Sequence, residues 1–271
     1  GYGRSCLERA IDVVKDRRDR GLVPFVMLKE QWRMAPDIRA LVSALSYDGM
    51  LRDAARMDVT SRGGHDRAPL FGKSIIMINI SFGMPQMVDN SKRNVEEANV
   101  VKAVYDQLKQ RRDKLGLPPS NDAFADRLGI VSPYRAQNRA ILAKLQGVDE
   151  DEVVGFADYN SSSALEPALD GGVDGLPSVG TAHQYQGSER DVIIMSACHL
   201  SAFAADLRLL NVKLSRAKHL LVIVGRLEQF AESNQHWRTI WQHRVHSHVI
   251  NAGTLEDVKQ KMAKLLGVHS Y

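Results

Sequence analysis

The sequence has little cysteine and no long apolar run. Its only two cysteines, Cys6 and Cys198, form neither a disulfide framework nor a metal-ligand cluster. Isolated thiols of this kind are typical of intracellular proteins, so we expect a cytoplasmic or nuclear location. No apolar segment approaches the ~20 residues that a membrane-spanning helix needs. These absences argue against a disulfide-stapled secreted protein and against a membrane protein.

The sequence also lacks a signal peptide and a phosphate-binding loop. The start, Gly1 to Arg9, has no apolar core, and we interpret the chain as a piece of a longer protein. A phosphate loop reads Gly-x-x-x-x-Gly-Lys-Ser/Thr and follows a strand. Gly72-Lys73-Ser74 ends like one, but Arg67 stands at the first glycine position and a strand follows the segment instead of preceding it. A self-contained nucleotide site is therefore not predicted.

The bulk composition is that of an ordinary globular protein. Hydrophobic residues make up 44% and charged residues 25% of the 271 positions. The net charge of +4 leans only weakly towards a polyanionic partner. Composition alone therefore does not identify what the protein binds.

Short apolar runs alternate with amphipathic helical stretches. Continuous apolar runs suit strands buried on both faces, and their alternation with helices predicts an α/β fold with a parallel sheet. The predicted strands are 25–28, 74–80, 128–131, 178–182, 192–197 and 220–225, and the predicted helices are 7–20, 36–45, 95–115, 136–145, 207–218 and 254–266.

We expect one large domain over residues 1–250 and a helical appendage over 251–271. Residues 57–69 are rich in Gly, Arg and Asp, and residues 149–177 are first acidic and then rich in Ser, Gly and Pro. Both are predicted to be mobile loops, because structureless segments of such length are unusual inside a compact domain.

Two segments carry arginines in suggestive places. Gln31-Trp32-Arg33-Met34-Ala35-Pro36 lies between a short strand and a helix, so Arg33 can reach a phosphate and the indole of Trp32 can stack on a base. Taken alone, the segment is better explained by a core Trp32 and a surface Arg33. Arg216 lies near a helix end just before a buried strand, where its planar fork can neutralise a transferring γ-phosphoryl group better than lysine could.

Two further segments follow strands. In Ser132-Pro133-Tyr134, the hydroxyl and the free amides of a helix start can hold a backbone phosphate, and Tyr134 can stack on a base. A simple connection with a capping serine is the alternative. The polar loop Thr181 to Asp191 lies between two strands, and loops at strand ends are the usual ligand sites of α/β sheets.

Together these segments resemble the second motor domain of superfamily-1B helicases of the nonsense-mediated-decay helicase and senataxin type. The family writes them Gln-Tyr-Arg-Met-His-Pro, Thr/Ser-Pro-Tyr-x-x-Gln, Thr-x-x-x-x-Gln-Gly-x-Glu-x-Asp and Leu-Asn-Val-Ala-Leu-Thr-Arg-Ala. All four occur here in the family order, and Asn94-Val95-Glu96-Glu97-Ala98 fits a fifth family segment. The resemblance covers residues 8–241 and implies a RecA-like, three-layer fold.

The resemblance assigns roles residue by residue. It implies that Trp32 stacks on adenine and that Arg33 and Arg216 are arginine fingers for the γ-phosphate. Gly187 and Glu189 then line the nucleotide side of the cleft, and Gln186 links the nucleotide state to the strand-binding surface. Positions near the nucleic-acid backbone are Ser132, Pro133, Tyr134 and Thr181.

The sequence departs from the family pattern in four places. Ala35 replaces a histidine, His183 stands where aspartate is common, and Ser215 replaces threonine. Lys213 replaces a small residue, and we expect it to be a solvated helix residue or else a phosphate contact. None of these changes removes an arginine or the Gln-Gly-x-Glu core.

The resemblance implies that ATP and Mg²⁺ are held mainly by an upstream RecA-like domain of the same protein, and that the partner is single-stranded RNA or DNA. This chain alone is then expected to be inactive. One alternative is a non-catalytic, helicase-like scaffold or regulatory module, which an upstream reading frame without an intact phosphate loop would indicate. Another is an unrelated doubly wound enzyme, but its Gly-x-Gly-x-x-Gly turn is missing. The sequence does not decide whether the substrate is RNA or DNA.

Overall fold

The computed structural model describes residues 28–54, 72–154 and 173–267. The chain divides into residues 1–30 and residues 31–271. Apart from Glu30, every helix and strand described below belongs to the second unit. The predicted helix 7–20, nearly all of the predicted strand 25–28 and the predicted loop 57–69 lie outside the described residues. Within the described residues, no helix is long and apolar enough to cross a membrane.

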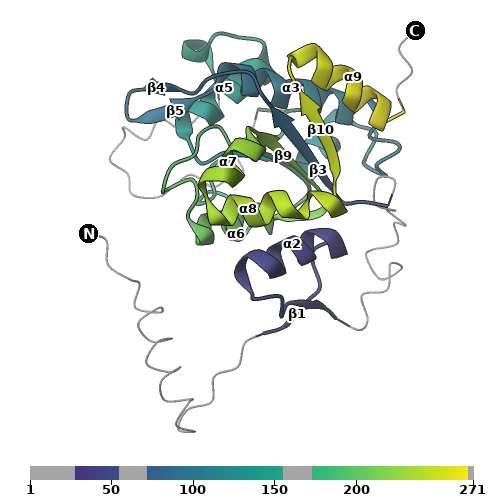
Figure 1. Ribbon diagram of the computed structural model, residues 1–271. Coiled ribbons are helices and arrows are strands. Elements are labelled where there is room, and N and C mark those ends of the chain that lie inside the picture. Colours follow the sequence, from purple (N-terminus) through teal and green to yellow (C-terminus); the bar gives the residue numbers. More distant parts are fainter. Residues whose placement is uncertain (1–27, 55–71, 155–172, 268–271) are drawn as a thin grey trace, which may run out of the picture. The chain divides into compact units, whose positions relative to one another are not determined.

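The centre of the domain is a fully parallel, six-stranded sheet (Figure 1). Its spatial order is β10-β3-β9-β8-β6-β7. We call the edge where the strands begin the amino edge, and the edge where they end the carboxyl edge. The strands are β3 (Ile75–Ile80), β6 (Leu128–Val131), β7 (Ser178–Gly180), β8 (Arg190–Ser196), β9 (Ala217–Gly225) and β10 (His248–Ala252).

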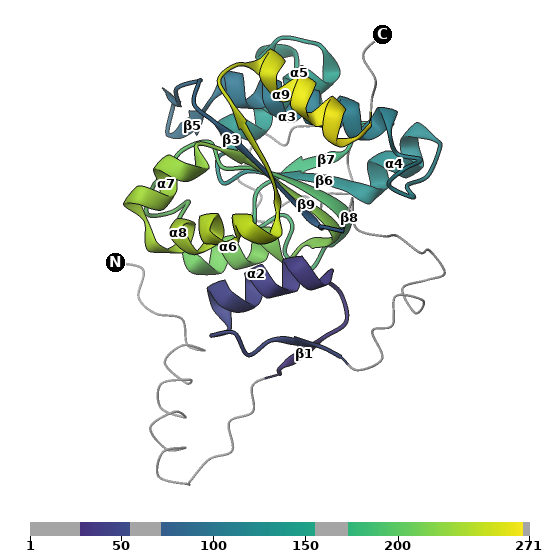
Figure 2. The same ribbon diagram turned by 45° about the vertical axis from the view of Figure 1, so that its right-hand side comes forward.

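Helices cover both faces of this sheet, which gives three layers (Figure 2). One face packs on α3 (Val95–Gln110), α4 (Asn121–Arg127), α5 (Arg135–Gln146) and α9 (Leu255–Leu265). The other packs on α2 (Pro36–Ser46), α6 (Leu207–Leu214), α7 (Leu227–Ser233) and α8 (Gln235–Gln242).

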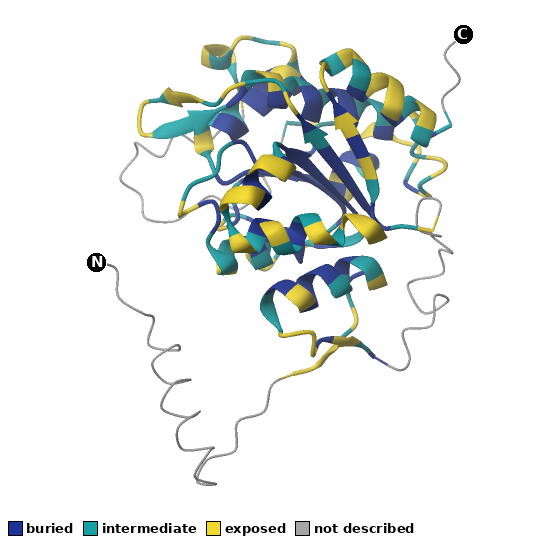
Figure 3. Ribbon diagram, in the orientation of Figure 1, coloured by how far each residue is buried: buried dark blue, intermediate teal, exposed yellow. Residues whose placement is uncertain are grey.

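Alternation along the strands produces these two cores. In β3, Ile76, Ile78 and Ile80 enter the first core, while Ile75 and Met77 enter the second. Successive side chains of a strand point to opposite faces, so an apolar run without alternation is the pattern of a strand that is covered twice. The buried residues accordingly follow the sheet and the inward helix faces (Figure 3).

Small elements lie outside the main sheet. β1 (Glu30–Gln31) pairs with β2 (Arg52–Asp53), and β4 (Gln86–Val88) forms an antiparallel hairpin with β5 (Ser91–Arg93). Two short 3₁₀ helices are η2 (Glu150–Glu152) and η3 (His243–His246). Of the predicted loop 149–177, residues 155–172 lie outside the described part, and the described beginning includes η2.

The fold confirms the predicted parallel sheet with helices on both faces. The helix predicted over 207–218 ends at Leu214, because β9 begins at Ala217, and the predicted domain boundary is wrong. The expected limit at residue 250 falls inside β10, which pairs with β3 from His248 to Ala252. Val258, Met262 and Leu266 then enter the first core. Residues 248–266 therefore complete the sheet and its helical cover and are not an appendage.

Candidate functional site

The first group of candidate residues lies at the amino edge, around the connection from β1 to α2. The Gln31 side chain shapes this connection, because its Oε1 accepts hydrogen bonds from the backbone N–H groups of Arg33 (2.8 Å) and Met34 (2.7 Å). The Ala35 N–H donates to the Lys218 carbonyl at the start of β9 (2.7 Å). Gln31 therefore positions Arg33. In the sequence, the only indication of this role is that Gln31 is the first residue of the segment.

Arg216 reaches the same edge from the connection between α6 and β9. Its Nε donates to the Val212 carbonyl (3.1 Å) and its Nη1 to the Ser188 carbonyl (3.2 Å). Burial, and then the positive charge of Arg33, lower the pKa of Arg216, although a guanidinium stays protonated in proteins. Arg33 and Arg216 therefore come close enough to repel each other.

Glu189 supplies negative charge beside these arginines. Its Oε1 lies 2.5 Å from Lys218 Nζ, and its Oε2 lies 3.9 Å from Arg33 Nε. The second distance is too long for a hydrogen bond, and the buried Arg33 Nε has no hydrogen-bond partner among the described residues. We call Arg33, Glu189, Arg216 and Lys218 the amino-edge cluster. Three cations share one carboxylate there, so an anionic ligand would relieve an excess of positive charge.

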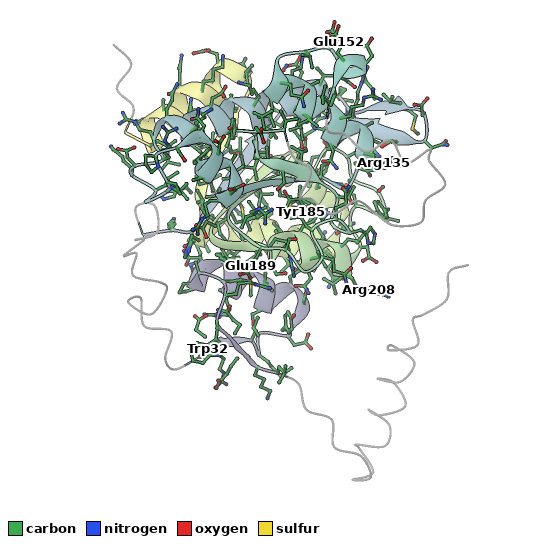
Figure 4. All side chains as sticks on the ribbon, turned by 180° about the vertical axis from the view of Figure 1, so that it is seen from behind. Trp32, Arg135, Glu152, Tyr185, Glu189 and Arg208 are labelled. Carbon is green, nitrogen blue, oxygen red and sulfur yellow. The ribbon has the colours of Figure 1, made fainter. Side chains whose placement is uncertain are left out.

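Exposed residues adjoin this cluster in the sequence. Trp32 precedes Arg33 and is 61% exposed, which leaves its ring available for stacking. Gln186 and Gly187 form an exposed turn just before Glu189, and Gly187 has a φ of 89° that residues with a side chain rarely adopt. Trp32 and Glu189 lie towards the same end of the domain, around α2 (Figure 4).

The second group of candidate residues lies at the carboxyl edge. Tyr134 follows β6, is partly buried, and has its hydroxyl 2.6 Å from Ser201 Oγ and 3.2 Å from the His199 carbonyl. Thr181 follows β7 and is partly exposed, and its N–H donates to Gln184 Oε1 (2.8 Å). The structure thus separates the candidates into two groups, one at each edge of the sheet.

Ser132 and Pro133 are placed differently from the expectation of an open helix start. Ser132 is 0% exposed, and its buried Oγ has no hydrogen-bond partner in the described part of the chain. Pro133 is buried as well. The reason is that β6 is an inner strand between β8 and β7, and Asn138 of α5 reaches back to the Ser132 carbonyl (3.4 Å). The Ser132 hydroxyl is therefore not at the surface.

Comparison with known proteins shows which family the chain belongs to. A family model described as AAA domain matches residues 2–228. The chain belongs to this family, within the superfamily-1B helicases. The helicase domain thus has the RecA-like fold of that superfamily.

Individual helicases resemble this helicase domain over most of its length. Probable helicase senataxin of Mus musculus is 25% identical over 89% of this chain and 8% of the relative, and probable helicase MAGATAMA 3 of Arabidopsis thaliana is 26% identical over 83% and 24%. The regulator of nonsense transcripts 1 homolog of Drosophila melanogaster is 26% identical over 97% and 20%. The chain thus spans less than a quarter of each of these relatives.

One short loop of the helicase domain carries candidate residues of both edges. The strands are parallel, so the segment from Thr181 to Glu189 leaves β7 at the carboxyl edge and enters β8 at the amino edge. Tyr185 anchors its middle, because it is fully buried and its hydroxyl contacts Ser178 Oγ (2.7 Å) and the Ile130 N–H (3.1 Å). Gly129 makes room for this ring, since an added Cβ would come within 2.6 Å of the hydroxyl.

Lys213 of the helicase domain contradicts both expectations stated for it. It is 0% exposed, so it is neither solvated nor available to a phosphate. Its Nζ donates to the Ala204 carbonyl (3.4 Å), and burial lowers its pKa to about 7. The reason is that α6 turns this position into the second core, between Leu210 and Leu214.

A second buried ionisable group, Glu97, lies at the start of α3. Its Oε1 accepts hydrogen bonds from Ser196 Oγ (2.6 Å) and from the Cys198 N–H (2.8 Å), both at the carboxyl end of β8. Gln137 of α5 joins the network through Ser196 Oγ (3.1 Å) and the Asn94 N–H (2.6 Å). Burial raises the pKa of Glu97 to about 7 despite these donors. The network fixes the helicase domain's backbone where β8 ends.

This environment predicts a pH-dependent stability that Glu97→Gln removes. The folded-state pKa of about 7 lies above the ordinary value of 4.5, so the folded state holds a proton that the unfolded state loses between these values. Stability therefore falls as pH rises from 4.5 to 7, by up to roughly 3 kcal/mol. Urea unfolding between pH 5 and pH 8, read as the difference between Glu97→Gln and wild type, measures it.

The matched control for this experiment is Glu96→Gln, because Glu96 is the exposed neighbour on the same helix. We expect its stability to follow wild type at each pH. If Glu97→Gln also followed wild type across the whole range, the carboxyl group would not titrate as its burial requires.

Across the described residues of the helicase domain, no group of three or more His, Cys, Asp or Glu side chains could hold a metal ion.

Lys73 and Ser74, of the segment that resembles the end of a phosphate loop, form hydrogen bonds with other parts of the domain. Lys73 Nζ donates to the Ser247 carbonyl (2.9 Å), and the Ser74 N–H donates to Asp37 Oδ2 (2.8 Å).

Proposed function

We propose that this chain is the second motor domain of an ATP-dependent helicase that moves along single-stranded RNA or DNA. The observation that carries the proposal is the amino-edge cluster, in which Arg33 and Arg216 come together against their mutual repulsion. The Val212 and Ser188 carbonyls hold Arg216, and the carboxylate of Glu189, the residue after Ser188, lies 3.9 Å from Arg33 Nε. Paired guanidinium groups are suited to the charge on a transferring phosphoryl group.

The nucleotide would enter this cluster with the upstream RecA-like domain of the same protein. The described sequence has no phosphate loop, so that domain would hold ATP and most of the Mg²⁺ contacts. Trp32 would stack on the adenine, because its ring is exposed next to Arg33. Gly187 and Glu189 would line the cleft, and Arg33 and Arg216 would act on the γ-phosphate as arginine fingers.

The single strand would bind at the carboxyl edge. Thr181 and Tyr134 are the candidates with exposed surface, whereas Ser132 and Pro133 would act by shaping the turn that presents Tyr134. Gln186 lies in the loop that runs from Thr181 to Glu189. That loop is the shortest crossover between two strands of the sheet, so Gln186 would report the nucleotide state to the strand-binding surface.

The proposal is tested by ATP hydrolysis with the full-length protein. We expect single-stranded RNA or DNA to stimulate turnover, because closure of the two motor domains on ATP would depend on the bound strand. Oligoribonucleotides and oligodeoxyribonucleotides tested side by side decide which polymer is the substrate. Turnover that neither polymer changes, or an upstream region without an intact phosphate loop, would contradict the proposal and favour a scaffold.

A further inference from the structure

An aromatic group at the carboxyl edge includes two residues that no helicase motif named above contains. Tyr134 lies with its ring centroid 6.2 Å from that of His199 and 6.5 Å from that of Phe203. His199 and Phe203 belong to the connection between β8 and α6. Phe203 is 49% exposed. The three rings form one group with an open side at Phe203.

The connection that carries these rings is held in place along its length. Ser201 anchors it internally, because its Oγ accepts from the Ala204 N–H (3.1 Å) and its carbonyl accepts from the Ala205 N–H (2.9 Å). The Tyr134 hydroxyl, 2.6 Å from Ser201 Oγ, ties it to the turn after β6. Phe203 is therefore presented by a fixed backbone.

Two buried ionisable residues form hydrogen bonds to the backbone at the two ends of the same connection. Glu97 accepts the Cys198 N–H (2.8 Å) at its start, where Cys198 has a φ of 58°. Lys213 donates to the Ala204 carbonyl (3.4 Å) near its end. Burying an ionisable group costs free energy. Two such groups hydrogen-bonded to one short segment therefore indicate that the conformation of this segment serves a function.

The surroundings of the aromatic group are basic. Lys92 on β5 lies beside this group, because the neighbouring Ser91 accepts through its Oγ from the Ala136 N–H, two residues after Tyr134 (3.1 Å). Its positive charge contributes, after burial, to lowering the pKa of His199. Arg135 is exposed and follows Tyr134 directly, on the carboxyl-edge side of the domain (Figure 4). Exposed rings interleaved with basic side chains are the pattern of a single-strand binding surface, where bases stack on the rings and phosphates meet the cations.

We propose that Phe203, supported by Tyr134 and His199, is a stacking surface for a base of the bound single strand. The inference rests on the proposed function and deepens it, since it assigns a base-contacting role to a residue outside the family's segments. Because every base has a flat face, such a surface holds the strand without reading its sequence. Lys92 and Arg135 would meet the phosphates on either side.

The test uses the full-length protein and two substitutions at one position. Phe203→Leu keeps an apolar side chain without a ring, and Phe203→Tyr keeps the ring. Binding of a short oligouridylate and of a short oligothymidylate is measured by fluorescence anisotropy. We expect Phe203→Leu to weaken binding on the order of ten-fold and Phe203→Tyr to bind like wild type. The salt dependence of binding should be unchanged in both, because no phosphate contact is lost.

A strand with missing bases separates stacking from a general loosening of the connection. The oligothymidylate is made with one abasic position at each place in turn. We expect one abasic position to weaken wild-type binding and to have little further effect on Phe203→Leu, because ring and base would be the two halves of one contact. Equal binding by Phe203→Leu and wild type would overturn the inference, and so would additive effects at every position.

The same measurements distinguish this inference from the proposed function. If the wild-type protein binds a single strand and hydrolyses ATP in response, but Phe203→Leu behaves like wild type, only the stacking surface is wrong. If the wild-type protein binds neither oligonucleotide, the proposed function fails and the stacking surface fails with it.

Discussion

Replacing Arg216 with alanine in the full-length protein is expected to lower ATP turnover by roughly 10³-fold or more, while nucleotide binding is largely retained. The reason is that Arg216 would act on charge that develops during phosphoryl transfer and so would contribute little to ground-state affinity. Arg216→Lys should be nearly as defective, because an ammonium group lacks the planar fork. Steady-state turnover and the affinity for a non-hydrolysable ATP analogue measure the two effects separately.

Arg238→Ala is the matched control. Arg238 is exposed on α8, and its guanidinium also donates to backbone carbonyls, those of Ala231 (3.2 Å) and Glu232 (3.3 Å). Loss of such contacts alone should leave turnover intact. If Arg216→Ala kept wild-type turnover, or if it lost analogue binding and turnover in equal measure, the arginine-finger role would be ruled out.

Replacing Lys213 with methionine is expected to stabilise the domain, by as much as roughly 5 kcal/mol below pH 7. The folded-state pKa of about 7 lies below the ordinary value of 10.5, so the full cost of burying the ammonium group is present below pH 7. Between pH 7 and 10.5 only the unfolded state is protonated, so wild-type stability rises with pH in this range and the difference closes. Urea unfolding from pH 6 to pH 10 measures the difference.

Lys264→Met serves as the control for this change, because Lys264 is exposed on α9. We expect it to alter stability by less than about 0.5 kcal/mol at any pH. A Lys213→Met variant that is less stable than wild type at pH 6 would show that the hydrogen bond to the Ala204 carbonyl outweighs the cost of burial.

Glu97 and Lys213 act on stability in opposite directions as pH changes. The cost of the Glu97 carboxylate grows as pH rises from 4.5 to 7, and the cost of the Lys213 ammonium shrinks only above 7. Near pH 7 both costs are close to their full size. The domain therefore carries two destabilising residues at neutral pH. Both are hydrogen-bonded to the connection that presents Phe203. Proteins commonly retain destabilising residues where function requires them.

The inner strands of the sheet could be predicted from the sequence, whereas one edge strand could not. β3, β6, β8 and β9 are covered on both faces, so their sequences are continuous apolar runs. β10 is an outermost strand of the sheet, with a neighbouring strand on one side only. Its sequence is His-Val-Ile-Asn-Ala, and only Ile250 and Ala252 are buried. Such a short mixed pattern does not distinguish a strand from a loop. The domain boundary was misplaced for this reason.

The order of the segments along the chain predicts the candidate residues, but the environment of each residue follows from tertiary packing. Lys213 lies three residues after Leu210, on the side of α6 that faces the core, and Arg208 lies on the exposed side. Helical spacing places the two residues, but a lysine is so rarely buried that its residue type predicts a solvated position. Ser132 is buried because strands on both sides and α5 enclose its turn. Phe203 belongs to none of the family's segments, and its place beside Tyr134 follows only from the ring contact in the structure.

A sheet whose strands all run one way also limits how the two surfaces can be studied. Each crossover carries the chain from one edge to the other, so residues of the two edges interleave along the sequence: Arg33, Tyr134, Thr181, Glu189, Phe203 and Arg216. No contiguous truncation can therefore remove one surface and spare the other. Deletion mapping would report both losses together, and single substitutions are needed to assign ATP turnover and strand binding to separate residues.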